Sequence, residues 1–234
     1  MNYSKINNLT GWLCFIVAAV TYILTLEPSV SFWDCGEFIA SALKMQVVHQ
    51  PGAPLFLMIQ RFFSIFAGGD VTKVAYFMNL GSAIASAATI LFLFWTITAL
   101  VKKTIVKAGE IITTSQLVTI MGAGAVGALA YTFSDSFWFS AVESEVYALS
   151  SLFTAIVFWA ILKWEANANE PRADKWLLFI AYIMGLSIGI HLLNLLTIPA
   201  IAFVYYFKKT GKATNSGIIK TFFIGILILA VIQY

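Results

Sequence analysis

Residues 74–101 read VAYFMNLGSAIASAATILFLFWTITALV, a stretch without a charged side chain that ends directly before Lys102 and Lys103. About 20 apolar residues in a helix suffice to cross the hydrocarbon core of a bilayer. The stretch therefore predicts a transmembrane helix, and the two lysines indicate that it ends at a membrane surface.

The rest of the chain has the same apolar character. Of its 234 residues, 60% are hydrophobic and 11% are charged, and the mean hydropathy is +0.88. Soluble domains contain about 45–50% apolar and about 25% charged residues, so the composition predicts an integral membrane protein. The apolar stretches are long, which favours a helical bundle over the alternating pattern of an outer-membrane barrel. A nucleic-acid-binding protein and a soluble enzyme are both excluded.

Similar stretches predict an all-α, polytopic transmembrane bundle of about seven spans. The other spans are expected at residues 11–27, 115–133, 146–163, 176–191 and 193–207, and a seventh is expected to begin near Gly217. The chain stops inside an apolar run at Tyr234, so we interpret residues 1–234 as the N-terminal part of a single transmembrane domain. Cytoplasmic loops carry an excess of basic residues. This rule places three of the connections between spans on the cytoplasmic side. The first contains Lys102, Lys103 and Lys107, the second Lys163, Arg172 and Lys175, and the third Lys208, Lys209, Lys212 and Lys220.

In this topology residues 28–73 form the first external loop. Residues 54–67 are apolar but include Gln60 and Arg61 and are too few for a span, so they are expected to form a helix in the membrane interface. Acidic residues scarcely influence insertion, so their enrichment outside has another cause, and a polar binding or catalytic cavity is the simplest one. The polar residues at the outer face are Asp34, Glu37, His49, Arg61, Asp70, Asp135, Glu143, Glu145, His191 and Asn194.

The acidic motif in this loop is Asp34-Cys35-Gly36-Glu37. One interpretation is purely structural. In it Ser31 caps a helix, and the side chain of Asp34, at the third helical position, accepts a hydrogen bond from the backbone of Ser31. Glu37, however, lies three residues after Asp34 and shares its helix face, so the two carboxylates are expected to perturb each other's proton affinity. His49-Gln50-Pro51-Gly52 follows in the same loop, which brings a titratable imidazole near them.

The later polar residues have weaker signals. Asp135 is interpreted as part of a helix cap. Glu143 and Glu145 are expected on different faces of the next helix, so that at most one faces the cavity, with Tyr147 beside it. His191 and Asn194 line a predicted outward turn, where hydrogen bonding between helices is the alternative use.

Neither a nucleotide site nor a metal site is predicted from the sequence. Residues 122–127 match G-x-G-x-x-G, but they lie inside a predicted span without a preceding strand, so these glycines indicate close helix packing rather than a nucleotide site. No Asp-x-Asp motif occurs, and no Cys/His cluster has zinc spacing, so no metal site is predicted.

The motifs together resemble the glycosyltransferase-C superfamily, and specifically its protein O-mannosyltransferase-like bacterial membrane family. In that family an acidic motif follows the first span and a His-Pro-Pro type motif precedes the second. Residues 32–37 (FWDCGE) and 49–54 (HQPGAP) resemble these motifs, with Gln50 in place of the commoner proline. Residues 137–147 and 189–194 resemble further family segments.

The resemblance implies a GT-C-like fold and transfer of mannose or a related hexose from a polyprenyl-phosphate donor to a protein Ser or Thr hydroxyl, with inversion. It implies a cytoplasmic (inner) membrane protein whose active face lies outside or in the periplasm. Its partners would be the lipid-linked sugar, which is a substrate rather than a cofactor, an external acceptor protein and membrane lipid, with no nucleic acid and no metal. Asp34 would be the general base and Glu37 would assist it. The substrate-binding residues would be His49, Arg61, Glu143, Glu145, Tyr147, His191 and Asn194.

Other classes of membrane protein compete with this hypothesis. A flippase for the same lipid would use the same charges at the interface. A transporter is disfavoured, because its ionisable groups would lie near the midplane on broken helices in repeated halves. A non-catalytic anchoring protein would tolerate loss of both Asp34 and His49.

Overall fold

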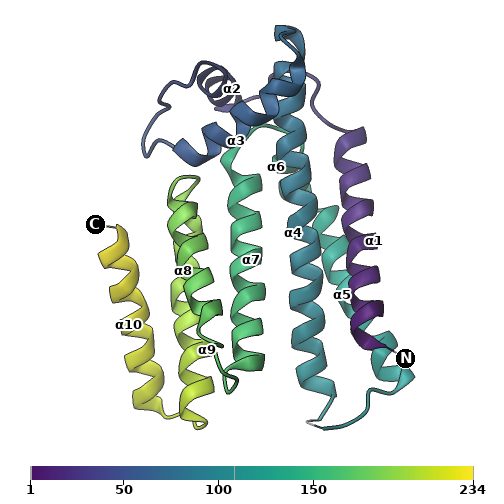
Figure 1. Cartoon of the computed structure of the whole chain (residues 1–234), viewed down its shortest axis with the longest axis vertical. Helices are drawn as coiled ribbons and strands as arrows, with labels where there is room; N and C mark the ends of the chain where they lie inside the picture. Colours follow the sequence, from purple (N-terminus) through teal and green to yellow (C-terminus); the bar gives the residue numbers. More distant parts are fainter. Residues whose placement is uncertain (1, 108, 234) are drawn as a thin grey trace.

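The computed structural model describes residues 2–107 and 109–233, and these residues form helices, turns and loops without a β-strand. Figure 1 shows a bundle of helices that run in alternating directions, with two short helices lying across one end. Four helices are long and apolar enough to cross a membrane. They are α1 (Tyr3–Leu24), α4 (Val74–Ile105), α7 (Val146–Asn167) and α10 (Asn215–Gln233).

The predicted count of seven spans is not confirmed. Helices α5 (Thr114–Thr132) and α6 (Asp135–Ala141) meet at a bend of 69° and make a fifth span if they are counted as one. Helices α8 (Lys175–Ile188) and α9 (Ile198–Thr210) are shorter than a span requires. They are short because the chain turns at Gly189 and then forms the 3₁₀ helix η3 (Leu192–Thr197), so the span predicted from residue 193 begins only at Ile198.

Helix α4 is the centre of the bundle. Its fully buried Ala83 and Ala87 belong to an apolar core with α1 and α5. Small residues let helices approach closely where lipid provides no hydrophobic driving force. A Cβ on Gly124 of α5 would lie 2.5 Å from Thr98 Cγ2 on α4, which confirms that this glycine serves packing.

We expect Gly124→Ala to lower the Tm of the purified protein by roughly 2–12 °C, because overpacking typically costs about 1–3 kcal/mol. The matched control is Gly122→Ala on the same helix. A Cβ there would meet nothing within 4 Å. Equal Tm values for the two variants in thermal unfolding would refute the close α4–α5 contact.

The loop between α1 and α4 folds over one end of the bundle (Figure 1). It contains α2 (Cys35–Lys44), α3 (Pro54–Ser64), η1 (Ile65–Ala67) and η2 (Val71–Lys73). Helix α3 buries Phe56 against the rest of the protein and exposes Arg61 and Phe62, as expected of a helix that lies in the membrane interface. The N–H of Leu55 donates to the carbonyl of Gly189 at 2.7 Å, which fixes the start of α3 on the turn after α8.

Candidate active site

Asp34 stands at the entrance to α2. It is the N-cap residue, but its side chain makes no capping hydrogen bond. The preceding Trp33 has a φ of 63°, which lies outside the right-handed helical region, so the helix cannot begin earlier. The alternative interpretation of Ser31 and Asp34 as a capping box is therefore wrong, and the Asp34 carboxylate is half exposed.

His49 joins the two carboxylates of the acidic motif. Its Nδ1 lies 2.8 Å from Glu37 Oε2, and its backbone N–H donates to Glu37 Oε1 at 2.7 Å. Its Nε2 lies 3.9 Å from Asp34 Oδ2. The hydrogen bond to Glu37 raises the pKa of His49, and the same bond lowers the pKa of Glu37. The predicted proximity of the histidine loop to the acidic motif is confirmed.

Two carboxyl groups are buried on the inner side of α2. Glu143 and Glu145 are each 3% exposed, and the Sγ of the buried Cys35 lies 3.8 Å from Glu145 Oε1. No basic side chain within the described ranges forms an ion pair with either group. Burial raises the pKa of Glu143, and it raises that of Glu145 to about 7. Near neutral pH, Glu145 is therefore protonated in a large fraction of the molecules.

The prediction that Glu143 and Glu145 lie on different faces of one helix is wrong. α6 ends at Ala141 and α7 begins at Val146, so both residues lie in the connection, with Glu145 as the N-cap of α7. Because an irregular connection does not follow helical periodicity, both side chains are buried. The charge of Asp34 also contributes to the raised pKa of Glu145, as expected if the two groups are neighbours.

Tyr147 and His191 form a second part of the site. Their ring centroids are 5.5 Å apart, and Tyr147 is exposed. His191 Nδ1 accepts a hydrogen bond from the N–H of Leu193 at 3.2 Å, which leaves the proton of the neutral ring on Nε2. Burial lowers the pKa of His191, so this imidazole favours the neutral form.

Two predicted binding residues form hydrogen bonds to residues outside these groups. Asn194 is fully buried, and its Oδ1 accepts from Thr154 Oγ1 of α7 at 3.3 Å, which supports the alternative of a hydrogen bond between helices. Arg61 Nη1 donates to Ser64 Oγ on its own helix, and no ion pair to the acidic motif is present in the described part of the chain.

Asn79 supports the site without having been predicted. It is fully buried on α4, and its Nδ2 donates to the carbonyls of Glu27 and Ser29 at 2.8 and 3.1 Å. These bonds fix the segment that leads from α1 to Asp34. An amide within an otherwise apolar span was the signal available in the sequence.

One atom each of Asp34, Glu37 and His49 lie within 4.8 Å of one another, close enough to bind a cation together. Oxygen and imidazole nitrogen are common ligands of divalent metals. His49 is already hydrogen bonded to Glu37, so a metal would have to displace that bond. The prediction of no metal stays a prediction.

The fold and the site define a multi-pass membrane protein that gathers carboxyl and imidazole groups at one end of its helical bundle. The chain belongs to the protein O-mannosyl-transferase TMEM260 family, whose N-terminal domain matches residues 34–214. This range contains every predicted site residue, and the predicted resemblance to protein O-mannosyltransferases is confirmed at the level of the family.

Two curated relatives are similar to the chain. The protein O-mannosyl-transferase tmem260 of Dictyostelium discoideum is 26% identical over 200 residues, which cover 83% of this chain and 22% of the relative. The protein O-mannosyl-transferase TMEM260 of Mus musculus is 30% identical over 185 residues, which cover 79% of this chain and 23% of the relative. The chain thus spans less than a quarter of either relative. No solved structure matches it.

Proposed function

We propose that this chain carries the catalytic end of a membrane glycosyltransferase of the GT-C type. The enzyme transfers mannose or a related hexose from a polyprenyl phosphate to a Ser or Thr hydroxyl of an acceptor protein outside the cytoplasmic membrane. The observation that carries the proposal is the exposed Asp34, Glu37 and His49 cluster at one end of the bundle. A lipid-linked donor presents its head group at such a boundary and needs no nucleotide pocket.

The surroundings of the two exposed carboxylates divide their roles. Glu37 is occupied by two hydrogen bonds from His49. The side chain of Asp34 accepts no hydrogen bond from any residue that the structure describes, so it is free to take a proton. Asp34 therefore acts as the general base, and Glu37 positions His49.

The reaction then proceeds in one displacement. The acceptor oxygen attacks the anomeric carbon while Asp34 removes its proton, and the bond from that carbon to the phosphate oxygen breaks. The phosphate leaves with the electron pair, and the configuration at the sugar is inverted. His49, whose protonated form is favoured by the hydrogen bond to Glu37, stabilises the departing phosphate. Tyr147 and the neutral His191 bind the sugar or the acceptor.

A transfer assay tests the proposal. Full-length protein in sealed vesicles is incubated with radiolabelled polyprenyl-phosphate mannose and a Ser/Thr-containing acceptor protein. We expect label to become covalently attached to the acceptor. Movement of the labelled lipid across the bilayer without transfer would identify a flippase, which uses the same interfacial charges, and would refute the enzymatic proposal.

A further inference from the structure

A second site lies at the opposite end of the bundle from α2 and α3. A cavity of about 920 Å³ is lined by residues of α1, α4 and α7 and of the segment after α4. This volume is within the usual range of about 300–1,000 Å³ for ligand sites. No residue of the candidate active site lines it, so the proposed transferase reaction leaves the cavity without a role.

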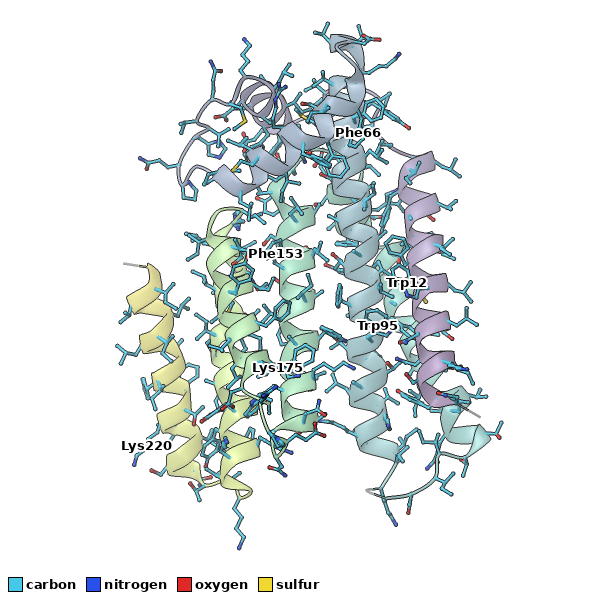
Figure 2. All side chains as sticks on the ribbon, in the orientation of Figure 1. Trp12, Phe66, Trp95, Phe153, Lys175 and Lys220 are labelled. Atoms are coloured by element: carbon cyan, nitrogen blue, oxygen red, sulfur yellow. The ribbon has the colours of Figure 1, made fainter. Side chains whose placement is uncertain are left out.

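The inner wall of the cavity is aromatic. Figure 2 shows Trp12 of α1 and Trp95 of α4 close together, and their ring centroids are 6.5 Å apart. Trp159 of α7 continues the wall at 6.1 Å from Trp95. Three helices thus contribute indole rings to one surface, which suits the acyl chains and glycerol backbone of a lipid better than a small hydrophilic anion.

The rim of the cavity is basic. Its charged lining residues are Lys102, Lys103, Lys107, Lys163 and Glu110. Lys102 Nζ lies 4.5 Å from the centre of the Tyr3 ring, and Lys163 Nζ lies 5.4 Å from the centre of the Trp159 ring. These aromatic contacts hold two of the ammonium groups beside the cavity. Lys103 is instead paired with Glu165.

The lining also offers polar atoms that lack partners. Asn7 Oδ1 and Trp95 Nε1 are buried and form no hydrogen bond within the described part of the chain. A buried polar atom without a partner is costly, and a hydroxyl-bearing ligand or water relieves that cost.

We propose that this cavity binds an anionic phospholipid, with its phosphate near Lys102 and Lys163 and its apolar part against the indole rings. Lysines and aromatic residues at a membrane surface also occur as topology signals and interfacial anchors. Such signals require neither a shared cavity nor ammonium groups held over aromatic rings. Charge complementarity at the rim and the aromatic wall together select an anionic lipid.

Native mass spectrometry of the full-length protein in detergent tests the proposal with phosphatidylglycerol as the probe. We expect Lys102→Gln/Lys163→Gln to weaken its binding about 30-fold, since a lysine beside an anionic lipid contributes about 1 kcal/mol. Lys107→Gln, a single change at the exposed rim, is expected to weaken binding about fivefold. The matched control is Lys175→Gln/Lys220→Gln, which removes the same charge at the same end of the bundle from residues outside the cavity (Figure 2).

Two further probes identify the ligand class. Phosphatidylcholine is expected to bind the wild type at least tenfold more weakly than phosphatidylglycerol, and millimolar inorganic phosphate is expected not to displace the bound lipid. The proposal is overturned if the control variant loses as much binding as the cavity variants. It is also overturned if phosphatidylcholine binds equally well, or if free phosphate competes and thereby identifies a soluble-anion site. A failure here leaves the transfer assay unaffected, because the two experiments measure different ends of the molecule.

Discussion

Asp34→Asn is expected to abolish nearly all sugar transfer while leaving the protein folded. A general base typically accelerates a reaction by a factor of about 10²–10⁴, and the amide of asparagine cannot take a proton from the acceptor hydroxyl. The side chain is half exposed and does not cap α2, so its replacement removes no structural hydrogen bond among the described residues. The measurement is the initial rate of labelled sugar transfer, together with the Tm of each protein.

The control for this prediction is Asp135→Asn. Asp135 is also an exposed carboxylate, and it lies in the first turn of α6. We expect this variant to keep wild-type transfer. Full activity of Asp34→Asn would remove Asp34 from the reaction, and equal losses in the two variants would indicate a general effect of negative charge on the protein.

Glu37 gives a different expectation from Asp34 because of its two hydrogen bonds with His49. If Glu37 acts only through His49, its loss changes the protonation of the imidazole and leaves the base in place. The distinction between the two carboxylates therefore depends on the observed position of His49. The sequence spacing of three residues only placed them near each other.

Much of the fold follows from composition. Long apolar stretches identify the four spanning helices because burial in lipid depends on hydrophobicity and length, which a sequence displays directly. The start of α7 at Val146 and the short amphipathic α3 were predicted on the same grounds. The two helices after α7 were also predicted, but as full spans, because a 3₁₀ segment such as η3, which delays the start of α9, has no distinctive hydrophobic pattern.

Only the part of the site that is formed by residues close together in the sequence could be predicted. His49 and Glu37 lie 12 residues apart between the same two spans, and their proximity was expected. Cys35 and Glu145 are 110 residues apart, and their contact depends on how α2 packs against the start of α7. The break between α6 and α7 contains no proline or glycine that would indicate it in the sequence. The burial of both Glu143 and Glu145 was therefore not predicted.

The buried Glu145 makes the stability of the fold depend on pH. Its pKa is raised from 4.5 to about 7, chiefly by burial. Because the folded chain binds this proton more tightly than the unfolded chain, the proton stabilises the fold fully below pH 4.5. That stabilisation is lost as the pH rises through about 7. The difference between the two pKa values corresponds to about 3 kcal/mol, or roughly 6–12 °C in Tm for a domain of this size.

Glu145→Gln is therefore expected to remove this part of the pH dependence. Glutamine resembles the protonated carboxyl in shape and stays neutral, so the variant should match the wild type in Tm at pH 4 and exceed it at pH 8. Subtracting the two curves isolates Glu145 from His49, whose raised pKa acts in the same direction, and from Glu37, whose lowered pKa acts in the opposite one. Glu170→Gln, at an exposed position, should follow the wild-type curve. If Glu145→Gln kept the wild-type slope, the raised pKa attributed to the burial of Glu145 would be wrong.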